Sequence, residues 1–456
     1  MDFDAVIHNG TLVTVDDRMQ IIQSGWIGIQ AGAIRAIEAS VPDMPPPDAR
    51  LSIDAAGSVV MPGLINTHTH LPMSLFRGLA DDLPLMDWLN NHIFPAEASF
   101  ITPETVRWGS LLACAEMLLS GSTCCCGGYF HEDAVARAVA ESGLRAVLAQ
   151  GVIDFPAPGV PDPAQNIAHA RDYARRWTGR NRLITPSIFC HAPYTCSDIT
   201  LKAAKAAADD LGLIFQVHVA ETRFESDQSI REKGLSPVAH LDRLGILDRR
   251  TLMAHCVWVD DADIATISRR GCAVSHCPES NMKLASGIAP VTGMRSAGVM
   301  VSLGTDGCAS NNNLDLFGEM GTAAKLHKVA TFDPTALNAA SVLKMATIDG
   351  AHAIGLADHI GSLEIGKQAD IVILDTRAPH LTPMYHPESH IVYTAGGADV
   401  RHVLVAGRQV VRDRRLLTIG IGEVIDRVNA IAGNIRSNLM VLNKGHSNRQ
   451  YWSNQL

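Results

Sequence analysis

The sequence predicts an α/β protein with a (β/α)8 TIM-type barrel and a small discontinuous β-sandwich formed by the N- and C-terminal segments. Between residues 59 and 361, short apolar runs alternate with helix-length amphipathic stretches, which is typical of parallel strands joined by crossover helices. Short strands of alternating polarity flank this region on both sides. Histidines and acids follow the predicted barrel strands, where such barrels place their chemistry.

Residues 1–58 are expected to form the first part of the sandwich, with turns at Asn9-Gly10 and Ala31-Gly32. Residues 362–430 are expected to form the second part. Because an isolated two-hairpin sheet is marginally stable in water, we expect the two segments to pair. The strands of the sandwich are predicted at 5–7, 11–14, 26–29, 33–37, 369–375 and 402–411.

The central segment, residues 59–361, is expected to form the barrel, and a C-terminal helix and tail are expected over 431–456. In such a barrel the carboxyl ends of the parallel strands lie on one face, so side chains at those ends are the first candidates for a functional site. The eight strands are predicted at 59–66, 123–129, 144–152, 183–190, 213–219, 251–256, 272–276 and 299–305.

Composition excludes several classes of function. Hydrophobic residues make up 47% of the 456 positions, which is enough for a large core and excludes disorder of the whole chain. The 38 basic and 47 acidic residues give a net charge of -9 without a basic run, so nucleic acid is not an expected partner. The GxGxxG and P-loop patterns are absent, which argues against a nucleotide cofactor.

The same sequence predicts a cytoplasmic protein that does not associate with a membrane. Asp2 and Asp4 stand where a secretory signal needs basic residues, and every apolar run is too short to cross a bilayer. The ten cysteines are spread through a long chain without a CxxC pair, so we expect reduced thiols. The sequence is compatible with either a monomer or a homo-oligomer.

Six histidines and two acids lie at or just after the predicted strand ends. His68 and His70 are two positions apart on an extended segment, so their side chains point to the same side and can share one metal ion. His218 and Asp306 complete a set of three nitrogens and one carboxylate oxygen, which suits a zinc ion with a position left for water. The remaining histidines of this group are His191, His255 and His276.

Glu221 lies three residues after His218, where it can face the same pocket without binding the metal. A partly buried carboxyl group suits proton transfer, because burial raises its pKa toward the working pH. We expect His255 to hold or polarise the reacting water. His276 is expected to be structural.

Several stretches of the chain resemble the amidohydrolase superfamily, and in particular its deaminases of 5′-methylthioadenosine and S-adenosylhomocysteine. The resemblance covers nearly the whole chain. Segments 62–70 and 303–307 match the superfamily in general. Residues 81–89, within the matching stretch 78–89, and residues 281–287 match this deaminase branch more specifically. The other matching stretches are 191–195, 218–222 and 275–288.

The resemblance implies a zinc-dependent hydrolytic deaminase that converts adenosine-type nucleosides to the inosine analogue and ammonia. One zinc ion per subunit is then bound by His68, His70, His218 and Asp306. Catalysis is assigned to Glu221, His255 and Asp306. Glu221 would protonate the purine ring, and Asp306 would take the proton of the water. The residues assigned to the substrate are Trp88, Glu97, His191, Glu221 and Asp306, with Glu97 binding the ribose hydroxyls.

Two positions depart from the family pattern and bear on the 5′ substituent. Relatives that bind the homocysteine carboxylate use arginines after the third strand, whereas this chain has Gln150 and Asn166 in that region. These positions therefore support 5′-methylthioadenosine and adenosine as substrates more strongly than S-adenosylhomocysteine. Cys277 also stands where related sequences often have asparagine.

Other interpretations of the same residues make different predictions. A guanine-type or triazine hydrolase would share the metal ligands and differ in the lining of the pocket. A binuclear amidase needs a carboxylated lysine at the end of the fourth strand, where this chain has His191. The HxE and PCxxC pattern of cytidine-type zinc deaminases is absent. A catalytically silent zinc scaffold would be expected to lose Glu221, His255 and Asp306.

Overall fold

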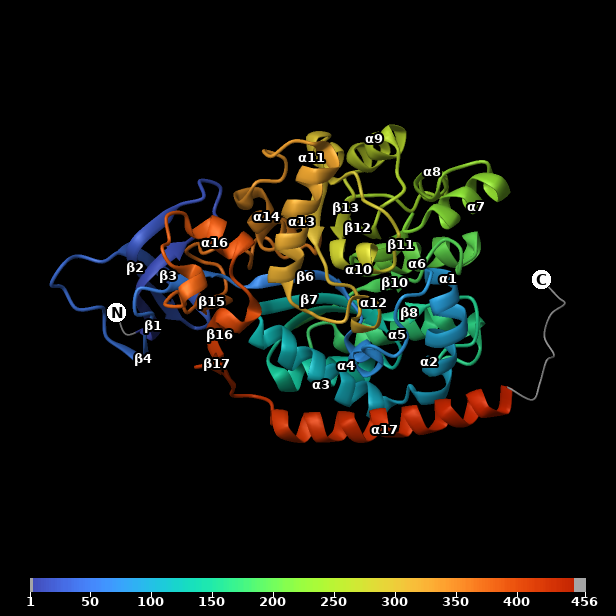
Figure 1. Ribbon diagram of the computed structural model, residues 1–456, viewed down its shortest axis with the longest axis horizontal. Helices are drawn as coiled ribbons and strands as arrows, with labels where there is room; N and C mark the ends of the chain where they lie inside the picture. Colours follow the sequence, from blue (N-terminus) through green and yellow to red (C-terminus); the bar gives the residue numbers. More distant parts are fainter. Residues whose placement is uncertain (1–2, 447–456) are drawn as a thin grey trace.

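Two β-sheets organise the protein (Figure 1), whose computed structural model describes residues 3–446, with side chains described through residue 438. One sheet is the barrel, surrounded by an outer layer of helices. The other is built from both ends of the chain and lies beside the barrel. The long helix α17 (Ile421–His446) runs along the outside of the barrel helices.

The barrel contains eight parallel strands in the order β14-β13-β12-β11-β10-β8-β7-β6, and the short β9 (Ile184–Pro186) pairs with β8. The predicted eight-stranded barrel is confirmed. These strands are almost wholly buried, because helices cover the outside and side chains fill the inside. Their bounds are β6 Leu64–Thr69, β7 Ser122–Tyr129, β8 Arg145–Val152, β10 Ile188–Cys190, β11 Phe215–Val219, β12 Thr251–His255, β13 Ala273–His276 and β14 Met300–Leu303.

The barrel closes between β14 and β6. The Asp306 amide donates to the His68 carbonyl at 2.9 Å, and the Thr67 hydroxyl donates to the Leu303 carbonyl at 2.8 Å. A Cβ atom at Gly304 would lie 2.8 Å from the His68 nitrogen, so only glycine lets the two chains approach this closely. The closure brings His68 and Asp306 together on one face.

One predicted strand is wrong in its extent. The apolar run at 59–66 divides into β5 (Val59–Pro62) and β6, separated by Gly63. β5 pairs with β1 and β15 in the terminal sheet, and only β6 belongs to the barrel. Both halves are fully buried, so hydrophobicity alone could not separate them.

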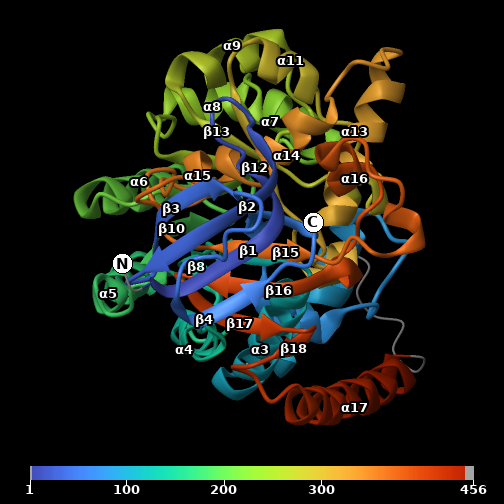
Figure 2. The ribbon, with the colours of Figure 1, turned by 90° about the vertical axis from the view of Figure 1, so that its left-hand side faces the viewer.

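The terminal sheet joins the two ends of the chain in the order β18-β17-β16-β15-β5-β1-β2-β3, with β4 pairing to β1 (Figure 2). The predicted pairing of the N- and C-terminal segments is confirmed, and hydrogen bonding makes them one continuous sheet. The other strand bounds are β1 Phe3–Val13, β2 Ile21–Gln30, β3 Ala33–Ala39, β4 Ala49–Asp54, β15 Ile371–Leu374, β16 Val400–Val405, β17 Arg408–Arg412 and β18 Arg415–Leu416.

The two predicted N-terminal turns have different outcomes. Ala31 and Gly32, with φ of 52° and 79°, form the turn between β2 and β3 as expected. Asn9 and Gly10 lie within β1, where the register to β2 shifts around them, and this prediction is wrong. The shift is typical of a β-bulge, and sequence signals for bulges and turns are alike because both need positive φ.

The helices of the barrel follow the strands and begin and end at recognisable residues. Thr102, Ser197 and Asp260 cap the N-termini of α3, α6 and α9 through their side chains. The bounds are η1 Leu71–Phe76, α1 Leu85–Asp87, η2 Trp88–Ile93, α2 Phe94–Phe100, α3 Pro103–Leu119, α4 Glu132–Ser142, η3 Pro163–Gln165, α5 Asn166–Trp177, α6 Asp198–Leu211, α7 Arg223–Lys233, α8 Pro237–Arg243, α9 Asp261–Arg270, α10 Pro278–Lys283, α11 Val291–Ser296, α12 Cys308–Asn311, α13 Leu316–Thr331, α14 Ala339–Met345, α15 Ile348–Ala353, η4 Pro379–Leu381, α16 Pro387–Tyr393 and η5 Gly397–Asp399.

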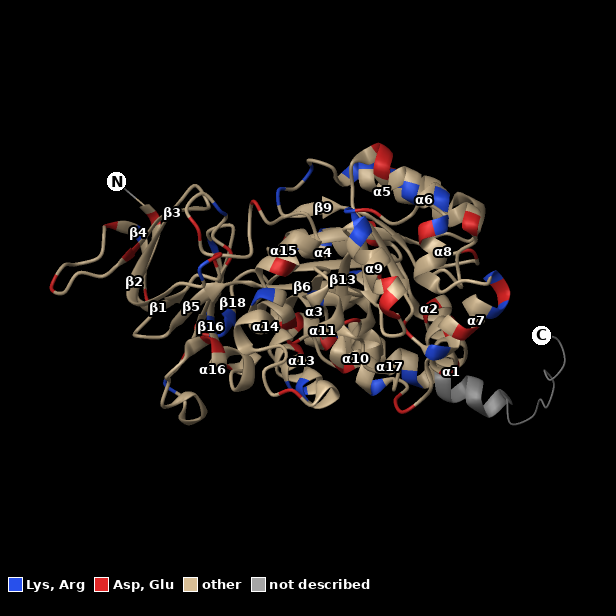
Figure 3. Ribbon diagram, turned by 90° about the horizontal axis from the view of Figure 1, so that it is seen from above, with Lys and Arg blue, Asp and Glu red and all other residues tan. Residues whose placement is uncertain are grey.

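Helix α17 packs against α3 through a stripe that includes Val424, Val428 and Ile435. It begins at Ile421, whereas the sequence placed the start of the C-terminal helical segment at 431; the end of the expected tail, 447–456, lies outside the described residues. Basic and acidic residues are interspersed on the outer helices (Figure 3). Within residues 3–446, no helix is long and apolar enough to cross a membrane.

Candidate active site

Four predicted metal ligands converge at the carboxyl ends of the barrel strands. The Nε2 atoms of His68 and His70 each lie 3.4 Å from Asp306 Oδ1. His218 Nε2 lies 3.1 Å from His68 Nε2. The residues come from β6, the segment after it, β11 and the segment after β14, so the barrel alone brings them together.

In three of these side chains, the atom that points away from the cluster is hydrogen-bonded to a neighbouring protein group. The atoms that could bind a metal ion therefore face the centre of the cluster. His70 Nδ1 lies 2.8 Å from the Gly128 carbonyl, and His218 Nδ1 lies 2.7 Å from the His191 carbonyl. Nδ1 is therefore the donor in both rings, and Nε2 carries the free lone pair. Asp306 Oδ2 accepts hydrogen bonds from two serine hydroxyls, those of Ser280 and Ser310 at 2.8 and 2.7 Å.

The protonation states of the cluster suit a cation. Burial lowers the pKa of His68 to about 4, so the ring is neutral at neutral pH. Burial acts to raise the pKa of Asp306, but the neighbouring histidines outweigh it and hold the pKa well below the usual value. Neutral imidazoles and an ionised carboxylate are the forms that bind metal, so the residues fit a divalent cation.

Glu221 and His255 lie beside this cluster, as predicted. His255 Nε2 is 3.8 Å from Glu221 Oε2, and His255 Nδ1 is 2.9 Å from Asn281 Oδ1. Burial raises the pKa of Glu221. His255 also lies with His68 and His218 in a group whose nitrogens are all within 4.8 Å of one another. His255 is therefore close enough to the proposed metal ligands to contact a water molecule held beside them.

Three residues at the site have a left-handed backbone. The φ angles of Ala220, His255 and Asp306 are 52°, 73° and 61°. Such angles cost about 1 to 3 kcal/mol each for a residue with a side chain and persist where the surroundings impose them. Their location at the ends of β11, β12 and β14 shows that the fold holds these side chains in fixed directions.

A cavity adjoins the cluster on the side of β7, β8 and β10. It is lined mainly by apolar side chains, including Met73, Phe94 and Phe130, and by the predicted site residues Glu97 and His191. The Tyr129 hydroxyl donates to Glu97, and burial raises the pKa of Glu97 to about 7. Burial also lowers the pKa of His191 to about 3.

Other predicted residues lie away from this cavity. Trp88 is 5% exposed and packs in the main hydrophobic core, while the following Leu89 lines the cavity. The contact of Trp88 with a substrate therefore stays a prediction. His276 Nε2 lies 3.1 Å from His327 Nε2, which agrees with a structural role. Gln150 Oε1 accepts from the Glu132 amide, so that side chain points toward α4.

Sequence reasoning missed several residues that hold the site. Asn281, Ser280 and Ser310 orient His255 and Asp306 through hydrogen bonds. Tyr129 holds Glu97, and Glu225 accepts from the backbone of Glu221. Asn281 is part of the 281–287 stretch, so the resemblance to the family could have identified it as a site residue. Ser280 lies in the matching stretch 275–288. Tyr129 carries no sequence signal, because its partner Glu97 lies on a different element. Ser310 and Glu225 lie close in sequence to Asp306 and Glu221, but nothing in the local pattern shows that their side chains turn back toward them.

The match to a protein family decides the classification of the chain. The model of the amidohydrolase family matches residues 59–410. The chain belongs to the amidohydrolase family. This match spans all eight barrel strands and part of the terminal sheet.

Relatives of this amidohydrolase have named activities. The 5-methylthioadenosine/S-adenosylhomocysteine deaminase of Syntrophobacter fumaroxidans is 47% identical over 95% of this chain and 98% of its own. The 5′-deoxyadenosine deaminase of Methanosarcina mazei is 46% identical over 94% of this chain and 98% of its own. Among solved structures, an adenosine deaminase from Xanthomonas campestris with bound zinc has a TM-score of 0.93 and 38% identity, covering 96% of this chain and 99% of its own.

Proposed function

We propose that this amidohydrolase is a zinc-dependent hydrolytic deaminase of adenosine-type nucleosides, releasing ammonia and the inosine analogue. The observation that carries the proposal is the convergence of His68, His70, His218 and Asp306 with Glu221 and His255 beside them. The activities named for relatives at 46 and 47% identity support it.

The four ligands are proposed to hold one zinc ion, which when bound lowers the pKa of water toward neutrality. Asp306 has Oδ2 held by two serine hydroxyls. Its Oδ1, which accepts from the Gly307 amide at 2.8 Å and faces the His68 and His70 nitrogens, is proposed to accept the proton of the attacking water. Glu221, whose pKa burial raises, is suited to give a proton to the ring nitrogen next to the reacting carbon. His255, whose Nε2 lies 3.8 Å from Glu221 Oε2, is proposed to hold or polarise the water.

The adjoining cavity is proposed to bind the nucleoside. Glu97, with one oxygen held by Tyr129, offers its other oxygen to the ribose hydroxyls. His191 is proposed to contact the base, since burial keeps its ring neutral. The contact of Trp88 with the nucleoside is likewise proposed, and the following Leu89 lines the cavity.

The lining of the cavity bears on the 5′ substituent. The described residues that line it include no lysine or arginine, and apolar side chains predominate. A charged amino acid group placed there would lose its hydration without a partner. We therefore propose that methylthio, deoxy and hydroxyl groups at the 5′ position are preferred over the homocysteine group of S-adenosylhomocysteine.

An ammonia-release assay with the purified zinc protein tests the function. The substrates are adenosine, 5′-methylthioadenosine, 5′-deoxyadenosine, S-adenosylhomocysteine, adenine, guanine and aminotriazines. We expect turnover of the first three nucleosides, with a lower kcat/KM for S-adenosylhomocysteine. Turnover confined to guanine or to triazines would assign the chain to another branch of the family.

A further inference from the structure

The catalytic Glu221 stands on a strained segment of backbone. It follows Ala220, which has a φ of 52°, immediately after β11 ends at Val219. Glu221 lies in the three-residue connection between β11 and α7, which has no regular secondary structure. Something besides the strand must therefore hold its main chain in place.

Glu225 supplies that support from the first turn of α7. Its side chain is buried, and its two oxygens accept the amide hydrogens of Ala220 and Glu221 at 2.9 and 2.8 Å. Thr222 caps the helix by accepting from the Glu225 amide at 3.2 Å. In an ordinary capping box the third helical residue reaches back to the capping residue, whereas Glu225 reaches one and two residues further.

The same peptide is held from the opposite side by the loop after β12. The Ala220 carbonyl accepts from the amides of Val257 and Trp258 at 3.0 and 2.9 Å. Val257 lies two residues after His255, the last residue of β12, so one hydrogen-bonded unit links the strand ends that carry Glu221 and His255. Glu225 is the part of that unit contributed by a side chain.

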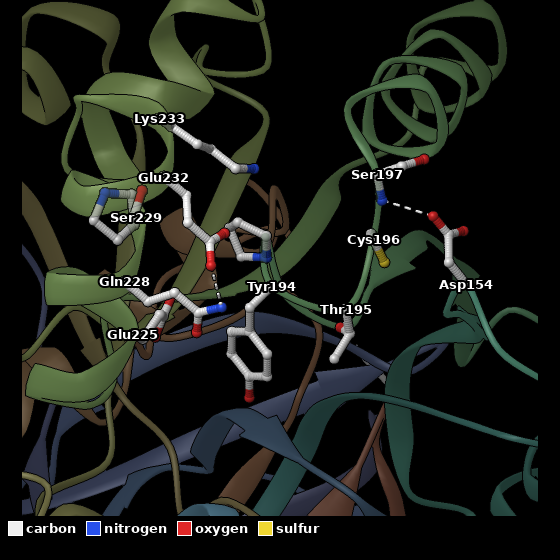
Figure 4. Close-up of a pocket in the computed structure, with 12 residues that line it drawn as sticks. Asp154, Tyr194, Thr195, Cys196, Ser197, Glu225, Gln228, Ser229, Glu232 and Lys233 are labelled. Carbon is white, nitrogen blue, oxygen red and sulfur yellow. Dashed lines mark hydrogen bonds between the residues drawn. The ribbon is translucent and has the colours of Figure 1, made fainter. Parts of the chain in front are cut away.

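Glu225 lies outside the reaction cavity. It borders a surface pocket between α7 and the segment 193–197, beside Gln228 (Figure 4), and it is not among the residues that line the cavity next to the metal ligands. A direct role in binding the substrate is therefore not needed to explain its burial. Its two backbone contacts account for both oxygens.

We propose that Glu225 is a positioning residue for deamination, which fixes the main chain of Glu221 so that its carboxyl group meets the ring nitrogen of the substrate. The inference rests on the proposed function. Only a carboxylate offers two acceptor oxygens to two converging N–H groups, because a glutamine would turn an NH2 group toward one of them. A misplacement of about 1 Å in a reacting group costs on the order of 100-fold in rate.

The test is the substitution Glu225→Gln in the full-length zinc protein. Because proton transfer matters in the transition state and little in the ground state, we expect kcat to fall at least about tenfold while KM changes less than about threefold. Zinc content and affinity for the inosine product should stay at the wild-type level. The matched control is Glu232→Gln on the exposed face of the same helix, where the carboxylate accepts from Gln228, and its kcat should not change.

Other outcomes overturn the proposal. An unchanged kcat in folded Glu225→Gln protein would do so, as would a loss of activity that only follows loss of zinc or of folded protein. If Glu225→Gln does not fold, Glu225→Asp takes its place, because it keeps both oxygens but draws them back by one methylene. It should lower kcat with little change in KM, and wild-type kcat in that variant would overturn the proposal. Failure of the proposed function is seen separately, because the wild-type protein would then release no ammonia from nucleosides.

Discussion

At the scale of single residues, the surroundings of two carboxyl groups in the site shift their pKa values in opposite directions. Burial acts to raise the pKa of Asp306, but the neighbouring histidines hold it well below the usual value. Glu221 is buried with fewer compensating contacts, and its pKa is raised. Two carboxyl groups whose pKa values are pushed apart in this way can act as base and acid in one reaction.

The substitution Glu221→Gln tests the proton-transfer role. The amide keeps the shape of the side chain but cannot give up a proton, so we expect kcat to fall about 100-fold or more. Zinc binding should remain, because Glu221 is not among the proposed ligands. Metal analysis and steady-state kinetics measure both quantities, and near-normal turnover would remove Glu221 from the mechanism.

Glu97 gives a prediction for the pH dependence of stability. Burial raises its pKa from the model-compound value of 4.5 to about 7, so the folded state holds the proton more tightly than the unfolded chain. Stability from this group is therefore present at low pH and falls as pH rises from about 4.5 to 7. The maximum loss is about 3 kcal/mol.

The variant Glu97→Gln removes this titration. We expect its melting temperature to exceed that of the wild type at pH 8 and to differ less at pH 5. If Glu97 binds the ribose as proposed, the selectivity of the variant for nucleosides over free adenine should also fall. An equal difference in melting temperature at both pH values would contradict the raised pKa.

At the scale of elements, an ion pair joins two segments across the mouth of the barrel. Lys283, at the end of α10, lies with its Nζ 2.6 Å from Asp81 Oδ1 and also contacts Asn312. Asp81 belongs to the segment that leads into α1, η2 and α2, where Glu97 lies. The pair therefore connects the 78–89 and 281–287 stretches, which lie far apart in the chain.

Replacing Lys283 by methionine should loosen this connection. Partly exposed ion pairs are worth about 0.2 to 1 kcal/mol, so KM for the nucleoside should rise about 1.4- to 5-fold with a smaller change in kcat. Lys202→Met, on the exposed face of α6, is the matched control. Steady-state kinetics at low and high salt measure the effect, and a KM equal to that of the control would show that the ion pair does not support binding.

At the scale of the whole molecule, a buried ion pair joins the two sheets. Arg145, at the start of β8, donates to both oxygens of Asp370 at 2.8 and 3.0 Å, and their side chains are 8% and 2% exposed. Asp370 precedes β15 and also accepts from the Ala406 amide. The contact therefore fastens the terminal sheet to the barrel.

Removing one member of this pair should lower the stability of the folded protein. Asp370→Ala leaves the Arg145 charge buried without a partner, so we expect a loss of about 3 to 5 kcal/mol in the free energy of unfolding, measured in urea. Asp210→Ala breaks an exposed pair with Arg171 and should cost no more than about 1 kcal/mol. Replacing both Arg145 and Asp370 by apolar residues should recover part of the loss. Equal effects for Asp370→Ala and Asp210→Ala would contradict this account.

Much of the fold could be predicted because it depends on local pattern. The eight barrel strands and the pairing of the terminal segments follow from short apolar runs and their order along the chain. The division at Gly63 and the bulge at Asn9 could not be predicted. In both cases the local sequence suits either outcome, and the partner strand decides.

The order of residues along the chain places histidines and acids at the strand ends, and this made His68, His70, His218 and Asp306 candidate ligands. That these four side chains meet at one point follows from the closed barrel, which brings together residues that are far apart in the chain. The tertiary structure also decided which groups hold Glu221 and Glu97, since Glu225 and Tyr129 act through contacts that depend on how helices and strands pack. The sequence gives the chemistry of each side chain. The direction in which a side chain points, and its distance from its partners, depend on how elements that are far apart in the chain pack together.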